Sequence, residues 1–121
     1  MLKLLKGDDF MIHEMKLVNW AFLKVKSGVK TIEMRLYDTK RRKINNGDII
    51  VFTNVDTNEK IKCRVINLYV FNNFEDLYNN FDKEVLGYEK HEEAKASDMS
   101  VFYSDEDIKK YGTVGIEIKV M

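Results

Sequence analysis

The chain has 121 residues, of which 45% are hydrophobic and 33% are charged, and its formal net charge at pH 7 is zero. This length and composition suit one modest globular domain, which we expect to span residues 1–121, and they exclude a disordered chain. No apolar run is long enough for a transmembrane helix, residues 1–9 lack the apolar core of a signal peptide, and the single Cys63 excludes an internal disulfide, so we expect a cytoplasmic protein without a membrane partner.

The N-terminal half of the chain predicts three strands and one helix. Residues 12–17 have the short apolar pattern of a strand, and residues 18–25 place apolar side chains at the spacing of an amphipathic helix. Gly28 ends that helix, because glycine adopts the left-handed conformation without a steric penalty. Residues 31–37 then alternate polar and apolar side chains, and residues 49–53 form a β-branched run typical of a strand buried on both faces.

The C-terminal half predicts two more strands and two short helices. The apolar phase of residues 61–70 slips by one position, which indicates a β-bulge within a long strand. Two asparagines can cap a helix over residues 74–81, and Ser104 can cap a second helix that ends at Gly112. Residues 114–120 alternate cleanly and predict the last strand.

These elements favour an α+β fold that is mainly β. We expect a small β-barrel of about five to six strands with flanking and inserted short helices, closed by pairing of the first and last strands. Strands and helices do not alternate regularly, which argues against a doubly wound fold.

Charge is distributed unevenly along the chain. Residues 30–46 carry six basic and two acidic side chains, a net charge of +4, whereas residues 71–110 carry five basic and eleven acidic ones, a net charge of −6. A local cationic patch can meet a few phosphates, but the acidic segment would repel a long polyanion. This pattern favours a nucleotide or single-stranded nucleic acid over an extended duplex.

The basic segment contains a compact group of ionic side chains on one expected strand. Lys30, Glu33 and Arg35 lie within six residues, and the alternation of a strand points Glu33 and Arg35 to the same side. A guanidinium offers paired donors to a phosphate or a base edge, an ammonium supplies a point charge, and a carboxylate accepts an exocyclic amine. The alternative interpretation is a solvated salt-bridge face on an exposed strand, which would contribute about 0–1 kcal/mol per pair.

The neighbouring residues extend this candidate site. Tyr37 shares the polar face and can stack on a base, although packing against its neighbours is the competing interpretation. Residues 40–43 are four consecutive cations that either contact phosphate or form a solvated loop. The candidate ligand-binding residues are Lys30, Thr31, Glu33, Arg35, Tyr37, Lys40 and Arg41. We expect no metal site and no cofactor, because His13 and His91 each lack a second ligand at suitable spacing.

The eight residues from Gly28 to Arg35 resemble the G-x-K-x-x-E-x-R signature of the ASCH (activating signal cointegrator homology) domain family. Three further segments also resemble the sequences of this family: His13 to Leu17, Gly47-Asp48 and Tyr111-Gly112. The resemblance implies a PUA-like β-barrel, related to domains that bind modified RNA. It further implies a cleft near the signature that holds a nucleotide, a modified nucleoside or single-stranded RNA.

The same resemblance implies an enzymatic alternative. Some small bacterial members hydrolyse the acetyl amide of acetylated cytidine with a lysine, a threonine and a glutamate, and Lys30 matches that lysine. The position of their threonine is occupied by Glu33, while Thr31 lies one residue past Lys30. Other members are ribonucleases that rely on a tyrosine, a lysine and a serine, of which only Lys30 can be placed.

Three functional hypotheses follow from these patterns. The first is a module that binds RNA or a nucleotide around the signature. The second is an amidohydrolase or ribonuclease in which Lys30 and Glu33 are the candidate catalytic residues. The third is a protein-interaction domain that contacts a protein partner through the acidic segment 71–110.

Overall fold

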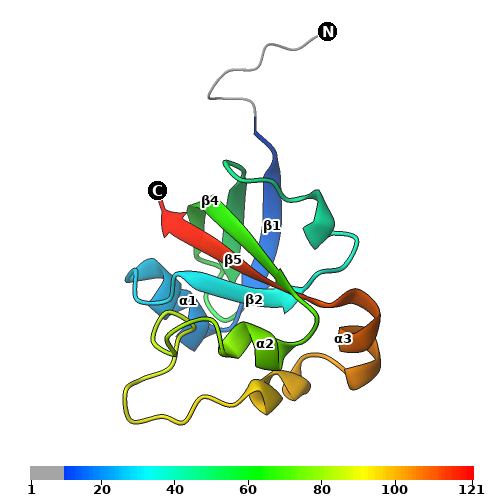
Figure 1. Cartoon of the computed structure of the whole chain (residues 1–121). Coiled ribbons are helices and arrows are strands. Elements are labelled where there is room, and N and C mark those ends of the chain that lie inside the picture. The colour runs from blue at the N-terminus through cyan, green and yellow to red at the C-terminus, as the bar shows by residue number, and fades with distance from the viewer. Residues whose placement is uncertain (1–9) are drawn as a thin grey trace, which may run out of the picture.

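One five-stranded sheet dominates the structure, a computed structural model that describes residues 10–121 (Figure 1). Residues 1–9, and the expectation about a signal peptide made for them, lie outside the described residues. The strand order is β1-β3-β4-β5-β2. The strands are β1 (Ile12–Leu17), β2 (Ile32–Leu36), β3 (Ile49–Asn54), β4 (Lys60–Phe71) and β5 (Thr113–Val120). The α-helices are α1 (Asn19–Lys26), α2 (Phe74–Tyr78) and α3 (Asp105–Tyr111), and two 3-10 helices are η1 (Arg41–Lys43) and η2 (Ala96–Val101).

The expected α+β fold, mainly β, is confirmed, and so are several of its local details. The register of β4 against β5 shifts between Val65 and Asn67, where the sequence predicted a bulge. The side chains of Asn73 and Ser104 each accept a hydrogen bond from a backbone N–H in the first turn of the helix that follows. The helix expected over residues 74–81 is shorter and ends at Tyr78. Asn80 explains the difference, because its side chain donates to the Asp76 carbonyl and takes the place of a helical backbone bond.

The predicted closure of the barrel by its first and last strands is wrong. β1 pairs in parallel with β3, and β5 lies between β4 and β2, so β1 and β2 are the two edges of a curled sheet. Side chains join these edges instead of a backbone ladder. Arg35 Nη2 donates to the Lys16 carbonyl of β1 at 2.8 Å, and Lys40 Nζ donates to the Glu14 carbonyl at 2.7 Å.

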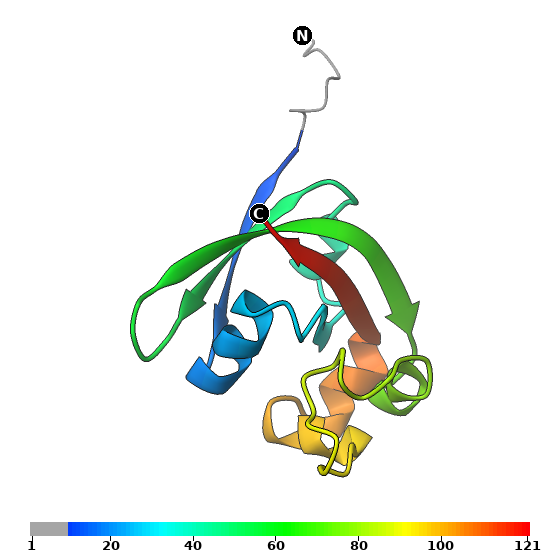
Figure 2. The same cartoon turned by 90° about the vertical axis from the view of Figure 1, so that its left-hand side faces the viewer.

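Two apolar clusters lie on opposite sides of β2. One cluster lies between the curled sheet and α1 and includes Phe22 and Phe52. The other joins β2 to α2 and η2 and includes Leu77 and Leu86. Seen from the side, β4 arches across the molecule, with α1 beneath one end of the arch and α2 and α3 beneath the other (Figure 2). Because β2 is covered on both sides, its polar side chains are buried as well as its apolar ones.

A buried histidine–aspartate pair ties β1 to the turn that precedes β3. His13 Nε2 and Asp48 Oδ2 are 2.8 Å apart, and Asp48 also accepts backbone N–H groups of Met11 and Asn45. Burial by itself would raise the pKa of Asp48, but these hydrogen bonds hold it below its usual value. None of the helices between residues 10 and 121 has the length and apolar character needed to cross a bilayer.

The glycine that ends α3 gives a test of the backbone geometry. Gly112 has φ 73° and ψ −169°, a region open almost only to glycine, and an added Cβ would lie 2.9 Å from the Phe71 carbonyl oxygen. Gly28 also has a positive φ, of 85°, but an added Cβ there meets open space. We expect Gly112→Ala to lower the free energy of unfolding by about 3 kcal/mol and Gly28→Ala by about 1 kcal/mol, measured by urea denaturation. Equal losses in the two variants would contradict this assignment.

Candidate functional site

A cavity of about 660 Å³ lies between β2, α1 and the segment that runs from α2 to η2. Three ionic side chains of β2 and the residues before it line it: Lys30, Glu33 and Arg35. Aromatic side chains from three separate segments form much of its wall: Trp20, Tyr78, Tyr88, Phe102 and Tyr103. The volume falls within the range of pockets that hold small organic ligands.

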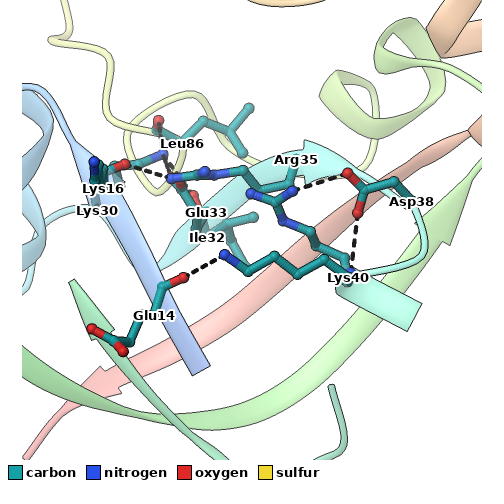
Figure 3. A network of polar contacts seen from close by, with 10 residues as sticks. Glu14, Lys16, Lys30, Ile32, Glu33, Arg35, Asp38, Lys40 and Leu86 are labelled. Atoms are coloured by element: carbon teal, nitrogen blue, oxygen red, sulfur yellow. Dashed lines mark hydrogen bonds and ion pairs between the residues drawn. The ribbon is translucent and has the colours of Figure 1, made fainter. Parts of the chain in front are cut away.

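The three ionic side chains form one buried chain of contacts (Figure 3). Arg35 Nε donates to Glu33 Oε2 at 2.6 Å, and Lys30 Nζ lies 3.4 Å from Glu33 Oε1. The exposed fractions of the side chains are 4% for Lys30, 6% for Glu33 and 14% for Arg35. The interpretation as a solvated salt-bridge face is therefore wrong, because this part of β2 is covered.

Lys30 Nζ donates two buried hydrogen bonds to carbonyls and forms an ion pair with a carboxylate. Its Nζ donates to the Ile32 carbonyl at 2.8 Å and to the Leu86 carbonyl at 2.9 Å, and the third partner is the Glu33 carboxylate. The bond to Leu86 holds the loop after α2 against the cavity. Gly87 permits this close approach, since a Cβ there would lie 3.2 Å from Lys30 Cδ.

Burial and charge act against each other in this group. Burial lowers the pKa of Lys30 below its usual value, although the negative charge of Glu33 opposes the shift. Burial alone would raise the pKa of Glu33, but the positive charges of Arg35 and Lys30 outweigh it and hold that pKa below its usual value. Glu33 is therefore a carboxylate that keeps acceptor capacity, and it is poorly suited to carry a proton at neutral pH.

Tyr103 lines the same cavity as the ionic chain. Burial raises the pKa of Tyr103, and the charges of Arg35 and Glu33 act on its hydroxyl. No hydrogen bond to this hydroxyl is formed by residues 10–121. Tyr88 differs, because its hydroxyl bonds to Asp98 at 2.7 Å and to the Tyr78 hydroxyl at 2.8 Å. Tyr103 is thus a polar group that faces the cavity without a protein partner in the described chain.

The structure separates the seven residues that the sequence grouped into one candidate site. Lys30, Glu33 and Arg35 line the cavity, whereas Thr31, Tyr37, Lys40 and Arg41 do not. The backbone N–H of Thr31 donates to the Val85 carbonyl.

The other three residues lie further along the chain. Tyr37 lines a different groove, where the Arg42 guanidinium lies over its ring at 4.3 Å from the centroid. Lys40 Nζ is bonded to the Glu14 carbonyl, and Arg41 Nη1 pairs with Asp38 at 3.0 Å. Arg41 Nε is buried, and no atom within residues 10–121 accepts from it. The ligand-binding role of all seven residues stays a prediction.

Much of the cavity wall comes from residues that sequence reasoning missed. Tyr78, Tyr88, Phe102 and Tyr103 lie in the acidic segment 71–110. The only available signal was the number of aromatic side chains among these charged residues, because their spacing follows no helical or strand period. Trp20 also lines the cavity and is 56% exposed. Within residues 10–121, no cluster of three or more histidine, cysteine or acidic side chains is placed to hold a metal.

Comparison with known protein families gives one match. The ASCH domain family matches this chain over residues 15–121. No curated protein matches it.

Three solved structures share the fold. The hypothetical protein PH0355 is 33% identical, with a TM-score of 0.77 and coverage of 92% of this chain and 100% of its own. Protein PF0455 from Pyrococcus furiosus is 36% identical, with a TM-score of 0.67 and coverage of 92% and 98%. The ASCH protein of Zymomonas mobilis, solved as a serine-to-alanine mutant, is 13% identical, with a TM-score of 0.60 and coverage of 92% and 69%. At that identity the third likeness concerns the fold alone.

Removal of the Glu33 charge tests the buried chain of contacts. Glu33→Gln leaves Lys30 and Arg35 without a counter-charge, so we expect the free energy of unfolding to fall by about 3–5 kcal/mol. Glu89→Gln is the matched control, because Glu89 also pairs with a lysine, Lys24, but is 54% exposed. Its loss should stay within about 1 kcal/mol. A loss in Glu33→Gln no larger than that of the control would contradict the burial described here.

The pH dependence of unfolding gives a second test of Glu33. Its pKa is lower in the folded protein than the usual 4.5, so its contribution is complete above pH 4.5 and is lost as the pH falls through the folded-state pKa. The difference in unfolding free energy between the parent protein and Glu33→Gln should therefore shrink on acidification below pH 4.5. A difference that stays constant or grows would show that the Glu33 pKa is not lowered.

Proposed function

Because the chain belongs to the ASCH domain family, as its motif predicted, we propose that it binds single-stranded RNA or a nucleotide with one base in the cavity. The observation that carries this proposal is a buried carboxylate and guanidinium beneath aromatic walls in a cavity of about 660 Å³. Polar groups of this kind fix the orientation of a ligand, and apolar walls supply most of the contact area.

Each group at the site has a distinct role in the proposed complex. The remaining lone pairs of Glu33 accept an exocyclic amine or ring N–H of the base, and further N–H groups of Arg35 donate to a carbonyl or a phosphate. Tyr103 adds a hydroxyl that can donate or accept. Lys30 is a positioning residue, because its Nζ bonds to two protein carbonyls and pairs with the Glu33 carboxylate.

Trp20 offers a test that leaves the fold intact. Its side chain lines the cavity and is 56% exposed, so Trp20→Ala removes a stacking surface with little effect on stability. We expect nucleotide affinity to fall by about 1–3 kcal/mol, measured by titration with the four nucleoside monophosphates and a short RNA. Leu23→Ala is the control, since Leu23 is 50% exposed on the same helix and does not line the cavity. Equal affinities for the parent and Trp20→Ala would reject this stacking role.

A hydrolase acting on the bound nucleoside or RNA is the second candidate function. The observation that favours it is the lowered pKa of Lys30, which brings the amine closer to acting as a base. The lack of a nucleophilic side chain in the cavity, among the described residues, argues against this candidate. No serine, threonine or cysteine among residues 10–121 lines the cavity, and Glu33 stands where the related amidohydrolases carry their threonine.

Incubation with acetylated cytidine and with short RNA separates binding from turnover. Under the first proposal both substrates bind and are recovered unchanged. A product that forms with the parent protein and is lost in Lys30→Met, while Trp20→Ala only raises the KM, would establish the hydrolase instead. The cytoplasmic location and a protein partner for the acidic segment stay predictions.

A further inference from the structure

A second groove, of about 620 Å³, lies where β2 ends, between η1 and α3. Its basic side chains are Arg42, Lys109 and Lys110, and its one acidic side chain is Asp105. The groove is therefore cationic, although α3 begins within the acidic segment 71–110. The binding hypothesis developed for the cavity does not account for this arrangement.

Arg42 is held in place within this groove. Its guanidinium lies over the Tyr37 ring, 4.3 Å from the centroid, and Arg42 Nη2 donates to the Tyr111 carbonyl at 3.1 Å. A guanidinium has five N–H donors, and the exposed side chain of Arg42 leaves the others open to solvent. A cation fixed on an aromatic ring loses little conformational freedom when it binds an anion, which suits it to phosphate.

The cavity is lined by residues of β2, and the groove is lined by Tyr37, which follows the end of that strand. Arg35 lines the cavity and Tyr37 lines the groove, and residues two apart on a strand point to the same side, about 7 Å apart. Tyr37 continues the extended backbone, because its N–H donates to the Gly112 carbonyl. The basic residues 40–43 connect the two places. Lys40 is bonded to the Glu14 carbonyl of β1, a strand whose C-terminal residues line the cavity, and Arg42 is bonded to α3 beside the groove.

We propose that this groove holds the sugar-phosphate backbone of a single-stranded nucleic acid whose neighbouring nucleotide occupies the cavity. The inference rests on the proposed function. Arg42, Lys109 and Lys110 neutralise phosphates, and the cavity alone determines which base is accepted. A mononucleotide then uses only the cavity, whereas a longer strand uses both sites and binds more tightly and with a stronger dependence on salt.

The test compares a labelled single-stranded RNA with nucleoside monophosphates as probes. We expect Arg42→Gln and the double variant Lys109→Gln/Lys110→Gln to weaken RNA binding about tenfold. The slope of the logarithm of affinity against the logarithm of salt concentration should become shallower by about 0.7 for each phosphate that is no longer neutralised. Affinity for the monophosphates should not change. The lysine variant leaves the Arg42 guanidinium on the Tyr37 ring, so weaker binding there cannot come from disruption of that pair. Lys62→Gln, an equal change of charge at an exposed site on β4, is the control for Arg42→Gln.

The outcomes distinguish this inference from the proposed function. RNA binding and salt dependence that match the parent in both groove variants would overturn the inference, even if monophosphates still bind the cavity. A weakening by Arg42→Gln no greater than that by Lys62→Gln would overturn it too. RNA binding that depends on the groove but not on Trp20 would support the groove and reject the cavity as the base site.

Discussion

The buried contacts of Glu33 with Lys30 and Arg35 join β2 to the opposite edge of the sheet, where no backbone ladder is formed, and add to the backbone bonds between β2 and the loop after α2. Through Arg35 the carboxylate is joined to the Lys16 carbonyl on the opposite edge of the sheet, and through Lys30 it is joined to Leu86 in the loop after α2. A buried ion pair offsets its desolvation only when further hydrogen bonds support it, and Lys30 Nζ donates two, to the Ile32 and Leu86 carbonyls. The same carboxylate therefore closes the curled sheet and shapes the cavity.

Lysines also explain how a segment with little regular structure stays packed against the cavity. Lys24 Nζ donates to the Gly87 carbonyl at 2.6 Å, and Lys83 Nζ donates to the carbonyls of Lys90 and Glu92 at 2.7 and 2.6 Å. These bonds supply the partners that a helix or strand would otherwise give to the backbone. The wall of the cavity thus depends on lysine side chains that bond its backbone, and its aromatic residues need no periodic spacing.

Local patterns in the sequence predicted the elements well because each depends on neighbouring residues. Alternation predicted β2 and β5, the phase slip predicted the bulge near Val65, and Ser104 predicted the start of α3. The edge of the sheet that β1 occupies could not be predicted, because it depends on pairing with β3, more than thirty residues away. The burial of Glu33 depends on packing on both sides of β2, and Tyr103 reaches the cavity through contacts between distant segments.

Binding and hydrolysis require opposite protonation states of the Lys30 amine. As an ammonium, it bonds to the loop at Leu86 and its charge keeps Glu33 ionised, which favours a rigid cavity. As a base it would have to lose a proton, and with it one of these bonds, and the Glu33 carboxylate would then lose part of the charge that stabilises it. The lowered pKa of Lys30 reduces the cost of that loss, but the bonds to Ile32 and Leu86 oppose it. The geometry therefore favours recognition over proton transfer as long as the loop stays bound to Lys30.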